Sequence, residues 1–249
     1  MYKGYRVTVV IPALNEANNI AMVVQNLMAN THAGAALIDE IIVCDNGSTD
    51  ATAEVAHIAG ATVVHEAHKG YGAACLKAIS TIEDTDFVLF LNGDGAEDSC
   101  ESEALLLPLV QGYDMVIGSR ELGTRQPGAL SPQQRFGNKL ASFIIRHLWH
   151  QQCTDLGPFR AIRYQCLQQL NMQDKDFGWT VEMQIKAYRR GFWVKEIPVA
   201  ALTTQGPSNI SGTLKGTCLA GWKILSILVL SRPLKGRDSD KTLHIDDKP

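Results

Sequence analysis

The stretch from Val88 to Asp98, VLFLNGDGAED, combines side chains that can bind a divalent cation with a chain segment that would position them. Its apolar first half is typical of a buried strand, and Asn92 and Asp94 follow where that strand should end. Carboxylate and amide oxygens suit Mg²⁺ or Mn²⁺, and such a cation neutralises the diphosphate that leaves when a sugar is transferred from a nucleoside diphosphate. Glu97 can add an outer oxygen. A solvated acidic turn explains the same residues, so both interpretations are open.

A second polar cluster ends the run at residues 38–45, IDEIIVCD, which also reads as a buried strand. Asp45 closes this run, and Gly47 and Ser48 follow it. A carboxylate beside a glycine turn and a helix N-terminus can accept hydrogen bonds from a nucleobase or a ribose. An aspartate that only caps the following helix fits the same pattern. Both roles are therefore open for Asp45.

Apolar runs alternate with helical patterns along residues 1–120. The runs predict strands at 7–11, 38–45, 61–66, 86–92 and 113–119. Helices are predicted after a cap at Asn15, after a cap near Ser48, at 73–82 and at 105–110. This alternation predicts an α/β fold with a mostly parallel central sheet flanked by helices. Ligands of such sheets bind beyond the carboxyl ends of the strands.

The pattern changes after about residue 131. Helices are predicted at 136–149 and 179–190 and a strand at 194–200, whereas the segment CTDLGPFRAIR at 153–163 is expected to be irregular. A turn-rich loop at 203–213 precedes an apolar C-terminal helix at 214–231 and a charged tail at 232–249, which we expect to be disordered. The apolar helix is shorter than the roughly 20 residues that span a bilayer. We expect it to contact a membrane surface or a second copy of the chain.

The composition disfavours several classes of protein. The 249 residues include 23 basic and 26 acidic ones, for a net charge of −3, which argues against nucleic acid as a partner. Six cysteines without a CxxC pair indicate neither a zinc site nor a disulfide framework. GxGxxG and GxxxxGK[ST] motifs do not occur, which disfavours dinucleotide and P-loop chemistry. No leader precedes the first strand, so we expect a cytoplasmic protein, free or peripheral on the inner face of the membrane.

Several motifs in a fixed order resemble the family 2 glycosyltransferases of GT-A fold. They are VVIPALNEANNI, IIVCDNGSTDAT, HKGYGAA, VLFLNGD, VIGSR, TDLGPFRAIR and WTVEMQIKAYRRG. The resemblance covers roughly residues 7–213 and is nearest to the polyprenyl-phosphate (dolichyl-phosphate) sugar synthases and their bacterial relatives. It implies a GT-A domain at 1–213, with a nucleotide-binding half to about residue 120 and an acceptor half at 121–213.

The resemblance also implies roles for individual residues. For the donor nucleotide these are Pro12, Ala13, Asn15, Glu16, Asp45, Gly47, Ser48, Lys69, Gly70, Gly72, Asn92 and Gly93. Asp94 takes the metal position, Asp155 the position of a general base, and Glu182 that of an acid on the acceptor side. For the acceptor or the leaving diphosphate the implied residues are Arg120, Arg135, Arg160 and Trp179. Guanidinium groups match phosphate oxygens in shape, although a surface ion pair explains Arg135 equally well and a place in the core explains Trp179.

Two departures from the family pattern bear on function. Asn92 stands at the first position of the usual Asp-x-Asp motif, so we expect weaker cation binding, with Asp94 and the donor diphosphate still holding Mg²⁺ or Mn²⁺. Asn209 stands where relatives commonly carry a basic residue. The missing basic residue argues against a polyprenyl-phosphate acceptor more than it argues against a nucleotide-sugar donor.

The resemblance implies an inverting glycosyltransferase that uses a nucleotide sugar. UDP-glucose is slightly ahead of GDP-mannose as the expected donor, and the acceptor is either an alcohol or a lipid phosphate. The alternative is a degenerate GT-A domain that binds a nucleotide or a partner without catalysis. Asn92 and Asn209 favour this alternative, whereas the acids Asp45, Asp94, Asp155 and Glu182 speak against it. A sugar nucleotidyltransferase is disfavoured because its glycine-rich arginine loop is missing after the first strand.

Overall fold

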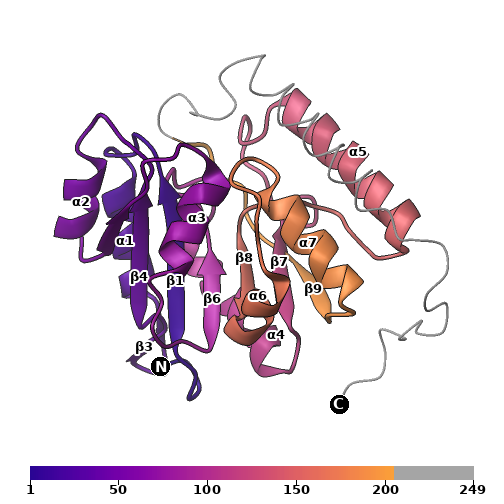
Figure 1. Cartoon of the computed structure of the whole chain (residues 1–249), viewed down its shortest axis with the longest axis horizontal. Helices are drawn as coiled ribbons and strands as arrows, with labels where there is room; N and C mark the ends of the chain where they lie inside the picture. Colours follow the sequence, from indigo (N-terminus) through magenta and orange to yellow (C-terminus); the bar gives the residue numbers. More distant parts are fainter. Residues whose placement is uncertain (205–249) are drawn as a thin grey trace.

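Buried apolar strands form the centre of the protein, in a computed structural model that describes residues 1–204. A seven-stranded sheet has the order β5-β4-β1-β6-β8-β7-β9 (Figure 1). Its strands are β1 (Val7–Ala13), β4 (Glu40–Asp45), β5 (Thr62–His65), β6 (Phe87–Phe90), β7 (Met115–Ser119), β8 (Arg160–Arg163) and β9 (Val194–Pro198). A small hairpin, β2 (Thr31–His32) and β3 (Ala35–Ala36), lies outside this sheet. The α/β class and the mostly parallel sheet predicted from the sequence are confirmed.

Parallel pairing brings the carboxyl ends of the first strands to one edge of the sheet. β1 pairs in parallel with β4 and with β6, and Ala13 at the end of β1 lies in register with Asp45 at the end of β4. The strands β1 and β6 are fully buried, which explains their continuous apolar sequences. The loops that follow the three strands therefore meet at one place.

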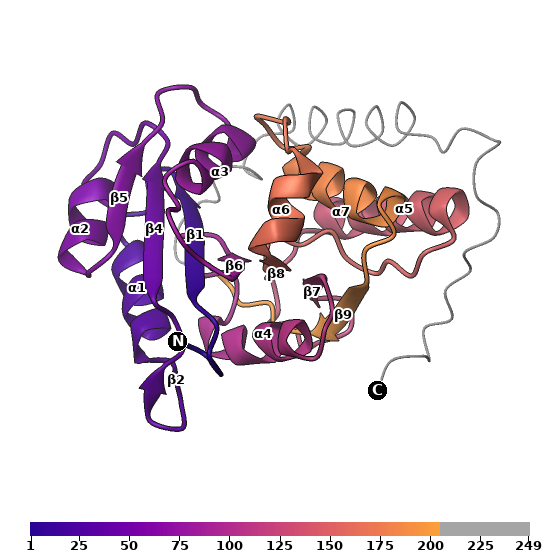
Figure 2. The same cartoon turned by 60° about the horizontal axis from the view of Figure 1, so that its bottom comes forward.

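Helices cover both faces of the sheet. They are α1 (Ile20–Ala29), α2 (Thr52–Ile58), α3 (Tyr71–Ile79), α4 (Ser102–Val110), α5 (Pro132–Trp149), α6 (Tyr164–Leu170) and α7 (Trp179–Arg189), with a 3₁₀ turn at Ser99–Glu101. One core cluster joins α1, α2 and α4 to one face, and another joins α3, α6 and α7 to the opposite face. Figure 2 shows α1 and α3 on opposite sides of β1 and β4. The alternating strand side chains thus fill two separate cores.

Helix α5 lies outside these layers, at the edge of the molecule (Figure 1). Ala141 and Ile145 on α5 pack against Val181 and Ile185 on α7 in a third cluster. The helix begins at Pro132, earlier than the apolar pattern predicts. Ser131 explains the difference, because its side chain and that of Gln134 form a reciprocal capping box.

Two local predictions need correction. The segment at 153–163 is not wholly irregular, since it ends in β8, which pairs antiparallel with both β6 and β7. The sequence RAIR conceals this strand because its arginines are satisfied by backbone carbonyls. Asn15 and Ser48 do not cap helices, because α1 begins at Ile20 and α2 at Thr52. Asn15 instead has a positive φ of 55°, and its backbone N–H donates to the Ser48 hydroxyl.

The predicted apolar helix at 214–231, the tail at 232–249 and nearly all of the loop at 203–213 lie outside the described residues. Within residues 1–204, no helix is both long enough and apolar enough to cross a membrane.

Candidate functional site

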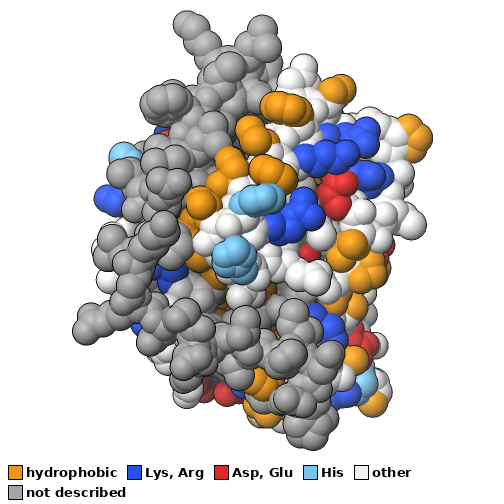
Figure 3. Space-filling model, turned by 90° about the vertical axis from the view of Figure 1, so that its right-hand side faces the viewer, with side chains coloured by type: hydrophobic (Ala, Val, Ile, Leu, Met, Phe, Trp, Pro, Cys, Tyr) orange, Lys and Arg blue, Asp and Glu red, His pale blue; other side chains and the backbone are white. Residues whose placement is uncertain are grey.

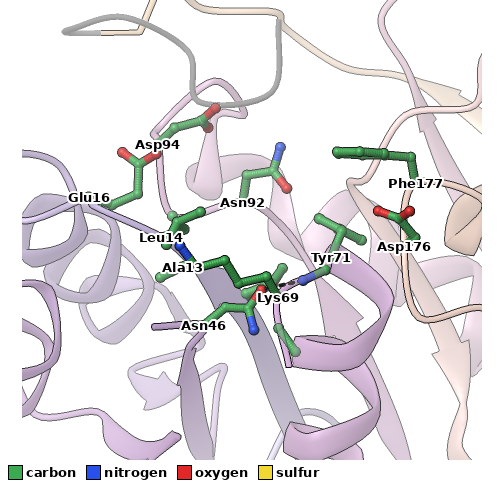
Figure 4. A pocket seen from close by; sticks show the side chains of 14 residues that line it. Ala13, Leu14, Glu16, Asn46, Lys69, Tyr71, Asn92, Asp94, Asp176 and Phe177 are labelled. Atoms are coloured by element: carbon green, nitrogen blue, oxygen red, sulfur yellow. Dashed lines mark hydrogen bonds between the residues drawn. The ribbon is translucent and has the colours of Figure 1, made fainter. Parts of the chain in front are cut away.

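A cavity of about 320 Å³ lies at the carboxyl ends of β1, β4 and β6. Figure 4 shows Glu16 and Asp94 on one side of it, Asp176 and Phe177 on the other, and Asn92 between them. The lining residues are Pro12, Ala13, Leu14, Glu16, Asn46, Lys69, Gly70, Tyr71, Ala74, Asn92, Gly93, Asp94, Asp176 and Phe177. Carboxylate oxygens, an amine and aromatic rings share this space, which suits a polar ligand that also carries a flat ring.

The structure brings together only part of the predicted donor set. Pro12, Ala13, Glu16, Lys69, Gly70, Asn92 and Gly93 line the cavity, as does the predicted metal ligand Asp94. Among the described residues, Asn15, Asp45, Gly47, Ser48 and Gly72 do not line it. The sequence analysis missed Leu14, Asn46, Tyr71, Ala74, Asp176 and Phe177.

The acidic side of the cavity is built on the turn after β6. The Asp94 carboxylate accepts a hydrogen bond from the Ala96 backbone N–H at 3.0 Å, and the buried Glu97 carboxylate accepts one from the Asn92 N–H at 3.2 Å. Burial raises the pKa of Asp94, and burial together with the Asp94 charge raises the pKa of Glu97. Asn92 Oδ1 and Glu97 Oε1 are buried without a hydrogen-bond partner among the described residues. Unpaired oxygens in such a place favour a cation.

An arginine–aspartate pair lies close to this acidic turn. Arg120 Nε and Nη2 each donate to the Asp155 carboxylate at 2.8 Å, and the Arg120 backbone N–H donates to it at 2.8 Å as well. The Asp155 side chain is 1% exposed. Burial raises the pKa of Asp155, but the charge and hydrogen bonds of Arg120 outweigh burial and hold that pKa below its ordinary value. The Arg120 charge also partly offsets the effect of burial on the pKa values of Asp94 and Glu97.

Asn46 fixes the loop that carries Lys69 and Gly70. Its amide nitrogen donates to the backbone carbonyls of Glu66 and His68, and its amide oxygen accepts from the Gly70 N–H at 2.7 Å. Asp45, directly before it, is also buried and accepts from the Ser48 N–H and from His65. The position of Asn46 directly after a strand could have identified it from the sequence. The donor role was instead assigned to its neighbour Asp45.

The segment at 174–176 closes the opposite side of the cavity. The Ala73 N–H donates to the Lys175 carbonyl at 2.9 Å, which ties this segment to the start of α3. Glu182 fixes the same segment, since its carboxylate accepts from the backbone N–H groups of Gln173 and Asp174 and pairs with Lys186. Glu182 is therefore occupied with holding this wall of the cavity.

The predicted glycines are needed where this segment crosses α3. A Cβ on Gly72 would lie 1.9 Å from the Asp174 carbonyl oxygen, and one on Gly70 would lie 2.0 Å from that of Lys175. Gly70 also has a φ of 150°, which other residues rarely adopt. Both positions therefore need glycine for reasons of packing.

Gly72→Ala is expected to destabilise the fold by about 3 kcal/mol, because the backbone at 174–175 must move to admit a methyl group. Thermal unfolding measures the change. Gly137→Ala is the matched control, since a Cβ there meets nothing within 4 Å and the residue lies inside α5. This control should gain up to about 1 kcal/mol. An unchanged melting temperature for Gly72→Ala would contradict the packing of 174–176 against α3.

None of the residues predicted for catalysis or the acceptor lines the cavity, and besides Arg120, Asp155 and Glu182 these are Arg160, Trp179 and Arg135. Arg160 is fully buried, and its guanidinium donates to the backbone carbonyls of Gly157 and Thr180. Trp179 is 1% exposed and packs edge-on against Phe90 in the core. Arg135 is exposed on α5. In this conformation Arg160 and Trp179 cannot contact an acceptor, because protein atoms surround them.

The chain is similar to known glycosyltransferases. A model described as Glycosyl transferase family 2 matches residues 8–170. Glycosyltransferase AglJ of Haloferax volcanii is 32% identical over 193 residues, which is 77% of this chain and 61% of that protein. An uncharacterized glycosyltransferase of Mycobacterium tuberculosis is 32% identical over 229 residues, 90% of this chain and 99% of that protein.

A solved structure with the same fold is that of glucosyl-3-phosphoglycerate synthase from Mycobacterium tuberculosis, in complex with Mn²⁺, UDP and glucosyl-3-phosphoglycerate. The TM-score is 0.74 at 21% sequence identity, and the match covers 94% of this chain and 83% of that one.

Proposed function

The chain belongs to glycosyl transferase family 2, and we propose from this premise that it transfers a sugar from a nucleotide sugar to an acceptor, with inversion at the anomeric carbon. The observation that carries the proposal is the cavity at the strand ends, where Asp94 and Asn92 lie opposite Asp176 and Phe177. A ligand with a base at one end and a diphosphate at the other needs such a division between an aromatic wall and a charged wall.

UDP-glucose is the proposed donor, with GDP-mannose second. Support comes from glucosyl-3-phosphoglycerate synthase, which has been solved with UDP and Mn²⁺ on the same fold. Lys69 reaches the cavity from the loop that Asn46 fixes, and its ammonium group would bind a phosphate oxygen.

The acidic turn fits the divalent cation that this reaction class implies. Asn92 Oδ1 and Glu97 Oε1 have no hydrogen-bond partner in the described structure, and Asp94 supplies a charged oxygen on the same turn. Within residues 1–204, no group of three or more histidine, cysteine, aspartate or glutamate side chains is arranged around one metal position. Asp94 and Asn92 would therefore hold Mg²⁺ or Mn²⁺ together with donor oxygens. A cation there would neutralise charge on the leaving diphosphate.

Arg120 is proposed to stabilise negative charge during transfer. Its guanidinium is held by Asp155, and its charge acts on Asp94 and Glu97, so it lies on the side of the cavity where the diphosphate would be. A general base is needed if the acceptor is an alcohol. A lipid phosphate is already ionised and needs only to be oriented, and we propose it as the acceptor because Asp155 is not free to take a proton in this conformation.

A degenerate domain that binds a nucleotide without catalysis is the second candidate. Asn92 favours it, since a neutral residue replaces an acid of the metal motif. Asn209, the other residue in its favour, lies outside the described residues. The acids Asp94 and Asp155 speak against it, because a domain that only binds a nucleotide has no need for acids on both the donor side and the acceptor side.

Calorimetric titration with UDP and GDP, each with and without Mn²⁺, tests the donor site. We expect UDP to bind, with affinity about tenfold or more lower without the cation, because the diphosphate would then meet uncompensated carboxylates. Mn²⁺-dependent binding of GDP in place of UDP would make GDP-mannose the proposed donor. Failure of both nucleotides to bind would contradict the proposed donor site, and binding without transfer from any nucleotide sugar would favour the degenerate domain.

A further inference from the structure

Helix α5 exposes large apolar side chains along one stripe, although it also packs against the protein. Phe136, Leu140 and Phe143 are 71%, 38% and 51% exposed. Their spacing places them on the same side of the helix, because residues four and seven apart share a face. The inner face, with Ala141 and Ile145, is buried against α7. The outer stripe is therefore a second apolar face, and no described residue covers it.

Basic side chains flank this stripe. Arg135, Lys139 and Arg146 are exposed, and at 100° per residue all three lie on the same side of it. None of them forms an ion pair with a residue in the range 1–204. The sequence of α5, PQQRFGNKLASFIIRHLW, contains no acidic residue. Figure 3 shows hydrophobic, histidine and basic side chains gathered on the side of the molecule that carries α5.

We propose that this outer face of α5, defined by Phe136, Leu140, Phe143, Lys139 and Arg146, docks on an anionic lipid bilayer. Aromatic side chains can enter the boundary between headgroups and acyl chains, while adjacent cations attract anionic headgroups. Lysine and arginine at the edge of such a face keep their charges among the headgroups while their stems lie along the apolar region. The helix lies at the edge of the described fold (Figure 1).

The basic charge beside the apolar stripe favours an anionic bilayer over a second copy of the chain or the segment at 214–231. A second copy of the chain would bring another set of the same cations against this face, which is unfavourable without acids to pair with them. The apolar segment at 214–231 of this chain carries Lys215 and Lys223 and no acid, so it would leave the same charges unpaired. An anionic surface alone satisfies both the apolar stripe and its basic flank.

Docking through the outer face would place α5 between the bilayer and the segment that contains Asp155, because that segment contacts the opposite side of the helix. Asn138 on α5 donates to the Thr154 carbonyl and accepts from the Leu156 N–H, so the helix is tied to both neighbours of Asp155. The docking surface stands on the exposed stripe and its charges, and it does not depend on which acceptor the enzyme uses.

Flotation of the full-length chain with phosphatidylcholine vesicles, with and without phosphatidylglycerol, tests the proposal. We expect binding only to the anionic vesicles and release by added salt. Phe136→Ser combined with Phe143→Ser, and separately Lys139→Gln combined with Arg146→Gln, should each lower the partition coefficient by about tenfold or more. All four side chains are exposed, so circular dichroism should show an unchanged fold.

Ile58→Ser is the matched control, because Ile58 is 76% exposed on α2 and that helix contains no lysine or arginine. Its partition coefficient should equal that of the wild type. Wild-type binding that the α5 variants retain would overturn the proposal and assign the contact to another segment. A wild-type chain that ignores anionic vesicles would overturn it as well, and self-association lost in the Phe136/Phe143 variant would then identify a second copy as the occupant.

Discussion

Asp94→Asn is expected to lower transfer by about a thousandfold and to remove the effect of Mn²⁺ on nucleotide binding. The substitution keeps the shape of the side chain and its hydrogen bond from the Ala96 N–H but removes the charge that would hold a cation. Stabilisation of developing charge on a leaving group is worth a few kcal/mol per interaction in a preorganised site. Because the first position of the motif is already Asn92, no second acid can replace Asp94 there.

The measurement combines steady-state transfer with calorimetry in the presence and absence of Mn²⁺. Asp98→Asn is the control, since it removes the same charge from the same turn, while its carboxylate accepts from the Cys100 N–H at the start of the 3₁₀ turn and does not line the cavity. Asn92→Asp provides the opposite change and should tighten cation binding. Equal losses for Asp94→Asn and Asp98→Asn would mean that the turn needs negative charge in general, and the assignment of Asp94 as a ligand would fail.

The positions of residues at strand ends could be predicted from the sequence. Local patterns locate each strand, and parallel pairing then brings the carboxyl ends of neighbouring strands together. Val7–Ala13 and Glu40–Asp45 end at the same level, so polar residues after each of them must meet. Asp94 was predicted from its place after a strand and Glu16 from the family resemblance, and both line the same cavity.

The other wall of the cavity was not predictable in this way. Asp176 and Phe177 precede α7, more than a hundred residues along the chain from Gly70, and only tertiary packing brings them to α3. The resemblance implied a donor role for Gly72 in the HKGYG motif, whereas the structure gives a packing reason for glycine there, because the Asp174 backbone crosses it. A motif records that glycine is required but does not reveal which distant segment requires it.

Buried charge also misled the reading of single residues. Arg160 stood in a motif with phosphate-binding chemistry, yet its donors are used by backbone carbonyls around β8. Glu182 was predicted to act on the acceptor, yet it accepts from the backbone of Gln173 and Asp174. Sequence patterns identify a charged group but not its partners, and partners decide whether that group is available for chemistry.

Asp155 could act either as a general base or as a residue that positions Arg120. As a general base it would need a carboxylate oxygen open to the acceptor, whereas all three of its contacts with Arg120 are at 2.8 Å and the Asp155 side chain is only 1% exposed. As a positioning residue it would act by fixing the guanidinium beside the acidic turn. The two roles differ in what they predict for pH dependence and for the double variant.

Asp155→Asn and Arg120→Lys are each expected to lower kcat by about a hundredfold, and the double variant should lose little more, because either change alone disrupts one unit. The pH profile of the Asp155→Asn variant should keep its shape, since no proton passes through this carboxyl group. Breaking a buried pair is also expected to cost about 3 kcal/mol of stability, so thermal unfolding accompanies the kinetics. Arg125→Lys is the control, because Arg125 forms a more exposed pair with Glu121 in the same loop and should change neither activity nor stability measurably. If Asp155 were the base, the rate of the wild type would rise with pH as this carboxyl group loses its proton. The Asp155→Asn variant would then lose that rise while Arg120→Lys kept it. Such a result would identify Asp155 as the base and would require the pair to open when the acceptor binds.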